Sequence, residues 1–102
     1  MGYDWIKCYY HLPDIQAQDL DFQTKNLNCR FDCYEVSKEG RLLLPRYDDN
    51  NCEFGKADML HHGTINIYGE WNIDRNMWFC YNLEFIKGQL KSIYSVKPFW
   101  KE

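Results

Sequence analysis

Cysteine and histidine are the residue types in this chain that could most readily hold a metal ion. The 102 residues include five cysteines and three histidines, and their closest spacings are Cys8-x2-His11, Cys29-x3-Cys33 and His61–His62. Structural zinc sites usually present C-x2-C knuckles, whereas Cys29 and Cys33 would stand about 13 Å apart on a strand that rises roughly 3.3 Å per residue. We therefore predict no metal site and interpret the cysteines as small apolar core residues.

The pair His61–His62 stands directly before Gly63 and could supply a general acid or base. Neighbouring residues on a strand point to opposite faces, so at most one of the two would face a given pocket. No serine, cysteine or carboxylate stands at a spacing typical of a catalytic signature with either histidine. A small enzyme that uses a histidine beside Asp58 or Glu70 is an alternative, but we assign no catalytic residue.

Aromatic residues are more numerous than one small core requires. Trp, Tyr and Phe make up 18% of the chain, and each ring can bury about 150–250 Å². In the run 77–85 large rings fall on both alternating faces, so either a second layer covers both faces or some rings form a binding surface. Tyr94 and Trp100 are further rings of this kind. The candidate residues for binding a partner or ligand are Gln23, Thr24, Lys25, Arg41, His62, Tyr68, Trp71 and Trp78.

Strands must position these side chains, because from Asp21 onward the hydrophobic pattern repeats every two residues. We predict strands over 27–36, 41–44, 62–71, 77–86 and 89–96. In the first of them alternate residues from Leu27 to Cys33 share a face, and Pro45 is expected to end the second. Residues 1–20 are expected to be an irregular segment with one helical turn after Pro13, and 46–60, rich in Asp, Asn and Gly, a long loop.

Two stretches with similar sequences, SKEGRLLL and FIKGQL, place a lysine and a glycine where the chain should reverse. Gly40 and Gly88 can take the positive φ of a tight turn, so each stretch predicts a hairpin. The chain is therefore predicted to be one mostly β domain over residues 1–102. We expect a hairpin-rich antiparallel sheet of about five to seven strands, curled or folded into two layers, with little helix.

Composition argues against several classes of partner. The net charge of −3 neither follows a phosphate backbone nor mimics one, so we expect no nucleic-acid binding. No stretch approaches the ~20 apolar residues of a membrane span. The sequence MGYDWIKCYYHLPD lacks the features of an export signal, and an odd number of cysteines favours reduced thiols. We therefore expect a cytoplasmic protein.

From about residue 21 to 94 the chain resembles a family of small proteins from bacteriophages, prophages and other bacterial mobile elements. The family pattern combines FQTK-x-L-x-C, a GRL turn, an HG-x-I-x-F/Y segment and a final aromatic hairpin. In this sequence it falls on Phe22–Lys25, Leu27, Cys29, Tyr34, Gly40–Leu42, His62, Gly63, Ile65, Tyr68, Trp78, Tyr81, Phe85, Gly88, Leu90 and Ile93. The resemblance implies a mobile-element setting, and it carries no known activity or ligand.

We expect from these observations a non-enzymatic interaction protein of the host cytosol, such as an inhibitor of a host defence factor. It would need no cofactor, its partner would be a protein, and it could form a homodimer through an edge strand. The alternative is a protein that sequesters a small nucleotide signal between Trp or Tyr rings, with Lys25, Arg30 or Arg41 near the phosphate.

Overall fold

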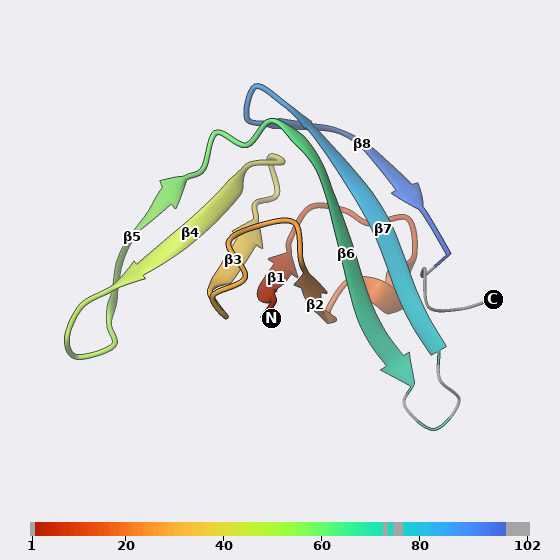
Figure 1. Ribbon diagram of the computed structural model, residues 1–102, viewed down its shortest axis with the longest axis horizontal. Helices are drawn as coiled ribbons and strands as arrows, with labels where there is room; N and C mark the ends of the chain where they lie inside the picture. Colours follow the sequence, from red (N-terminus) through yellow and green to blue (C-terminus); the bar gives the residue numbers. More distant parts are fainter. Residues whose placement is uncertain (1, 73, 75–76, 98–102) are drawn as a thin grey trace.

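The protein is known from a computed structural model that describes residues 2–72, 74 and 77–97. In this part of the chain eight strands form a single sheet in the order β5-β4-β3-β1-β2-β6-β7-β8 (Figure 1). Neighbouring strands are antiparallel except β1 and β3, which are parallel. The mostly β, antiparallel fold is therefore confirmed, with more strands than the five to seven predicted. Strands β5 and β8 form the edges, and pairing of two copies there stays a prediction.

The strands are β1 (Asp4–Cys8), β2 (Asp21–Thr24), β3 (Cys33–Val36), β4 (Leu42–Tyr47), β5 (Glu53–Asp58), β6 (Gly63–Asn72), β7 (Met77–Ile86) and β8 (Gln89–Ser95), with one 3-10 turn, η1 (Ile15–Ala17). The sheet is strongly bent, so that the β4–β5 hairpin and the long β6–β7 hairpin diverge on either side of β3, β1 and β2 (Figure 1). None of the helical segments described is long and apolar enough to cross a membrane.

One face of the bent sheet encloses the core. The buried core residues are Ile6, Cys8, Leu12, Ala17, Phe22, Tyr34, Val36, Leu42, Ile65, Ile67, Tyr81, Leu83, Phe85 and Leu90. As predicted, alternate residues of β6 and β7 point to this inner face. The segment that contains η1 packs against it, and the Tyr81 hydroxyl donates a 2.5 Å hydrogen bond to the Asp14 carboxylate. We call the opposite side of the sheet the outer face.

The prediction that residues 1–20 are irregular was wrong for β1, which lies in the middle of the sheet. Its inward side chains are Asp4, Ile6 and Cys8, all at most 1% exposed. A buried aspartate interrupts the expected alternation of apolar and polar residues, so the strand was not recognised. The predicted turn after Pro13 is present as η1.

The predicted strand over 27–36 is also wrong, because only Cys33–Val36 is extended. Before it, Cys29 and Phe31 have positive φ angles of 56° and 60°. The Asp4 carboxylate accepts hydrogen bonds from the backbone amides of Cys29 at 2.7 Å, and of Arg30 and Asp32 at 3.0 Å each. The buried carboxyl group therefore gathers the amides of a loop, and the segment does not extend.

The predicted long loop over 46–60 is instead mostly the β4–β5 hairpin. Pro45 does not end β4, and it stands opposite Lys56. The pairing of β4 with β3 ends at Leu43. At Pro45, therefore, β3 does not need the backbone amide proton that proline lacks. Strand β5 is exposed on both faces, and such a strand produces no hydrophobic alternation.

The two predicted tight turns are confirmed. Gly40 has φ 87° and Gly88 has φ 89°. Lys87 also has a positive φ, 49°, and Ile86 pairs directly with Gln89. Two central residues with positive φ define a type I′ turn, whose twist matches that of the strands it joins.

Candidate functional site

A row of directly opposed residues crosses the outer face from β1 to β7. Trp5 stands opposite Gln23, Gln23 opposite Tyr68, and Tyr68 opposite Cys80. Directly opposite residues of paired strands project to the same face, so the row is continuous. Trp78, two residues from Cys80 on β7, adds a ring whose centroid lies 6.4 Å from that of Tyr68.

Beside this row, where the paired register of β2 with β6 is short, the surface is hollowed. Among the described residues their paired register consists of Gln23 opposite Tyr68 alone. The hollow has a volume of about 360 Å³, and we call it the aromatic hollow. Its lining includes three rings and three carboxylates, those of Trp5, Tyr68, Trp78, Asp19, Asp21 and Glu70.

Gly69 forms part of the floor of the aromatic hollow. Its missing side chain lets Phe22 pack against the strand from below, since a Cβ at Gly69 would lie 3.0 Å from Cδ1 of Phe22 and 3.4 Å from Cδ1 of Leu20. A side chain at position 69 would therefore displace the Phe22 ring, which is itself fully buried. Tight packing on the inner face thus sets the floor of the hollow on the outer face.

The aromatic hollow is acidic. Lys7 lies 3.6 Å from the Asp21 carboxylate, whose side chain is 78% exposed, and its ammonium also donates to the backbone carbonyl of Asp19. Within the described ranges, Lys7 is the one cation that forms an ion pair at this hollow, and its partner is Asp21. Burial raises the pKa of the Tyr68 hydroxyl, so this phenol stays neutral and adds no negative charge at physiological pH.

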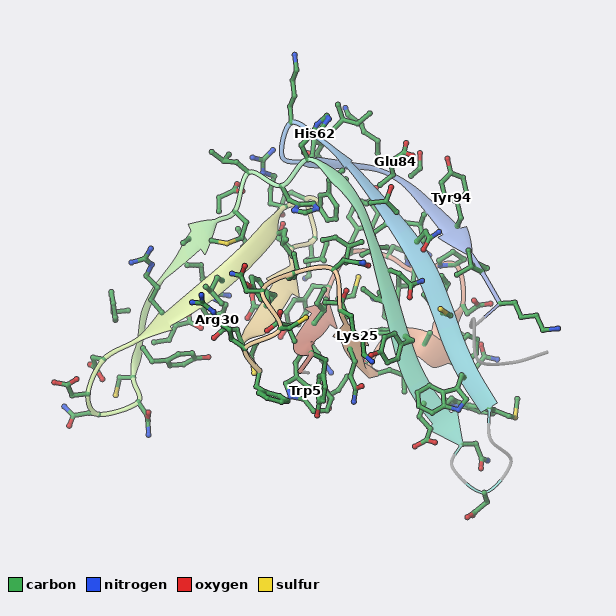
Figure 2. All side chains as sticks on the ribbon, viewed as in Figure 1. Trp5, Lys25, Arg30, His62, Glu84 and Tyr94 are labelled. Carbon is green, nitrogen blue, oxygen red and sulfur yellow. The ribbon has the colours of Figure 1, made fainter. Side chains whose placement is uncertain are left out.

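A second hollow of about 400 Å³ lies on the other side of Tyr68. It is polar and basic, with Lys25 and Lys97 beside the amide side chains of Asn26, Asn66 and Asn82. Figure 2 shows Lys25 beside β6. We call this the basic hollow; Tyr68 lines both hollows and separates opposite charges.

No family model, curated protein or solved structure matches this chain. Its function is therefore inferred from its own side chains.

The structure brings together three of the predicted binding residues, Gln23, Tyr68 and Trp78, at the aromatic hollow. Lys25 lies next to them in the basic hollow. Thr24 does not face a partner, because it is fully buried and its hydroxyl donates a 2.7 Å hydrogen bond to the carbonyl of Asn66. That prediction is corrected: Thr24 holds β2 against β6.

The other candidates lie elsewhere. Trp71 contacts Phe79, with ring centroids 6.3 Å apart, on the opposite face of β6 from Tyr68. Arg41 donates a 2.8 Å hydrogen bond to the Asp58 carboxylate, near the turns. His62 lies at the opposite end of the molecule from Trp5 (Figure 2). Trp100 lies outside the described residues.

The histidine pair occupies a structural setting. His62 Nδ1 accepts a 3.0 Å hydrogen bond from the backbone amide of Lys87. The His61 ring packs edge-on against Phe85, and its Nε2 is buried without a hydrogen-bond partner among the described residues. Burial lowers the pKa of His61, and the nearby His62 lowers it further. Asp58, a carboxylate considered for an enzyme, is paired with Arg41.

All five cysteines are free thiols. Cys8 fits the core interpretation, and burial raises the pKa of its thiol to about 11. Cys80 is also buried, but on the outer face. Cys33 and Cys52 are exposed and Cys29 is intermediate, so the core interpretation was wrong for these three, because the strands and loops that carry them turn those side chains away from the core.

Trp5, Asp19, Asp21 and Glu70 line the aromatic hollow but were not among the predicted binding residues; Glu70 was considered only as a carboxylate beside a catalytic histidine. A signal for Trp5 was present, since in YDWIKC the residues Tyr3, Trp5 and Lys7 alternate with Asp4, Ile6 and Cys8. The three carboxylates come from separate segments, and only folding places them around one hollow.

Proposed function

We propose that this chain is a non-enzymatic interaction protein of a phage or other mobile element, which binds a host protein in the host cytosol through the aromatic hollow. One observation carries the proposal: Trp5, Tyr68 and Trp78 gather on the outer face around a hollow of about 360 Å³. None of the three rings belongs to the core cluster that Phe22, Tyr81 and Phe85 fill; Trp5 and Trp78 are half-buried, whereas Tyr68 is 8% exposed. Aromatic anchors around a concavity are typical of binding hot spots.

A partner pull-down tests the proposal. The tagged protein is incubated with a bacterial host lysate beside the double variant Trp5→Ala/Trp78→Ala and the control Tyr94→Ala. Tyr94 is 53% exposed and lies on β8, away from the hollow. We expect one protein to be retained by the wild type and the control and lost with the double variant, with circular dichroism confirming that all three are folded. Equal retention by the double variant would contradict the assignment, as would turnover of a substrate with no partner recovered.

A nucleotide signal is the second candidate, favoured by the basic hollow. Lys25 and Lys97 could face a phosphate while Tyr68 offers a ring, and stacking on a ring contributes about 1–3 kcal/mol per base. Arg41 is paired with Asp58, so it is not part of this candidate. Titration of the protein with a nucleotide panel, followed by intrinsic tryptophan fluorescence and thermal shift, tests it. A response that Lys25→Ala abolishes would support it, and the absence of any response would remove it.

A further inference from the structure

We propose that the aromatic hollow receives an arginine side chain of the partner protein. The inference rests on the proposed function and specifies the chemistry of the contact. It follows from the combination of rings and carboxylates around one concavity, which suits a flat, cationic group.

The rings provide faces for a cation. The faces of indole and phenol rings carry negative electrostatic potential, and tryptophan attracts cations most strongly. Two tryptophans, Trp5 and Trp78, line the hollow with Tyr68. The Tyr68 and Trp78 rings are inclined at 47° and are not stacked face to face; Tyr68 is 8% exposed, so the half-buried Trp5 and Trp78 offer most of the ring surface. A planar guanidinium can lie against one of these faces while its edge points toward the rim.

The carboxylates favour a ligand with a positive charge. Asp19, Asp21 and Glu70 line the hollow, and among the described residues only Asp21 has an ion-pair partner, Lys7. A phosphate or carboxylate ligand would be repelled there, and an apolar side chain would remove water from the carboxylates without pairing them. A guanidinium presents five donors that match carboxylate geometry, so arginine satisfies the rim and the rings at once.

The size of the hollow agrees with one inserted side chain. Its volume of about 360 Å³ lies at the lower end of the roughly 300–1,000 Å³ typical of ligand sites. Its neighbour, the basic hollow, lies directly across Tyr68. A partner segment that places an arginine in the first hollow could therefore place an acidic residue in the second.

Nuclear magnetic resonance of the tryptophan indole N–H groups tests the proposal with a defined probe. The protein is titrated with N-acetyl-arginine amide and, as a matched neutral control, with N-acetyl-citrulline amide at constant ionic strength. We expect saturable shifts of the Trp5 and Trp78 signals with the arginine compound only. Trp71, on the opposite face of β6, should not respond. Assignment uses the Trp→Phe variants.

Removal of charge provides the second arm. Glu70→Gln and Asp21→Asn should each weaken binding of the arginine compound about threefold to tenfold, which corresponds to the loss of a charge contact of roughly 0.65–1.4 kcal/mol. The control Glu53→Gln removes an exposed carboxylate on β5 and should leave binding unchanged. Equal responses to the arginine and citrulline compounds, or unaltered binding in both hollow variants, would overturn the proposal.

The two proposals fail in different ways. If a partner depends on Trp5 and Trp78 in the pull-down but the arginine compound does not bind, the hollow is a protein-binding site with another ligand chemistry. If the arginine compound binds and no partner depends on the hollow, the protein-binding function is wrong and the hollow is a site for a small organic cation.

Discussion

The backbone amide of Leu90 donates a 2.8 Å hydrogen bond to the carbonyl oxygen of Gly40. This bond joins the turn after β3 to the start of β8, although the two strands lie far apart in the order of the sheet. Gln89 adds a second contact, because its side-chain amide donates to the carbonyl of Glu39 at 2.7 Å. The two turns with similar sequences therefore meet in space, and their contact holds the sheet in its bent form.

The glycines of these turns cannot be replaced without strain. We expect Gly40→Val and Gly88→Val each to lower the free energy of unfolding by ~1 kcal/mol or more, because both glycines have positive φ. A Cβ at Gly40 would lie 2.7 Å from Nε2 of Gln89, and one at Gly88 would meet the Arg41 guanidinium. Urea denaturation measures the change. Lys38→Ala, an exposed position, is the control and should alter stability by less than about 0.5 kcal/mol.

A neighbouring substitution should act in the opposite direction. Lys87 has a φ of 49°, which most residues with a Cβ adopt at a cost, whereas asparagine tolerates it because its short polar side chain can hydrogen-bond to the local backbone, and it favours type I′ turns. Lys87→Asn should therefore raise the free energy of unfolding by about 0.5–1 kcal/mol, seen as a higher thermal midpoint. A lower midpoint would show that Lys87 makes a stabilising contact that outweighs its backbone conformation.

Phe85 is a test of the core. It is 1% exposed and packs with His61 as well as within the core cluster. Phe85→Ala should cost about 3–5 kcal/mol, a large part of the ~5–15 kcal/mol typical of a domain. Phe54 is 66% exposed, so Phe54→Ala is the matched control and should be nearly silent. Equal unfolding midpoints for the two variants would contradict the assigned inner face.

The Asp4 carboxylate should be essential for the loop before β3. It is fully buried and accepts hydrogen bonds from three backbone amides. Asp4→Ala would leave those amides unsatisfied, and each buried unpaired group costs about 1–3 kcal/mol, so we expect a loss of at least ~3 kcal/mol in chemical denaturation. Asp49→Ala, at an exposed position of the β4–β5 connection, serves as the control. A small loss at Asp4 would mean that water or the loop itself replaces the carboxylate.

His61 should make stability depend on pH. Burial lowers its pKa in the folded protein, so as the pH falls the unfolded chain takes up a proton before the folded protein does. The contribution of neutral His61 to the free energy of unfolding is fully present above its ordinary pKa of about 6.5. It is lost as the pH falls through the lower pKa of His61 in the folded protein. When the pH is lowered from about 7 to about 5, we expect the free energy of unfolding to fall less in His61→Phe than in the wild type. His11→Phe, at an exposed position, should retain the wild-type dependence.

Much of the fold follows from local pattern. Alternation along 77–86 and 63–70 places Tyr81, Leu83 and Ile65 on one face, and an apolar face of that kind must be buried. The glycines at 40 and 88 determine the two turns for a similar reason, since positive φ is a local property of the backbone. These features need no knowledge of which strands become neighbours.

What local pattern could not predict depends on contacts between distant segments. Asp4 looks like a surface residue until the amides of Cys29 and Arg30, about 25 residues later, surround its carboxylate. The aromatic hollow likewise exists only in the folded chain, where the pairing of β1, β2, β6 and β7 brings Trp5, Trp78 and three acidic residues around one space. The sequence alone shows which residue types could bind a partner. Whether those residues lie side by side depends on the order and bend of the strands, which result from pairing between distant segments.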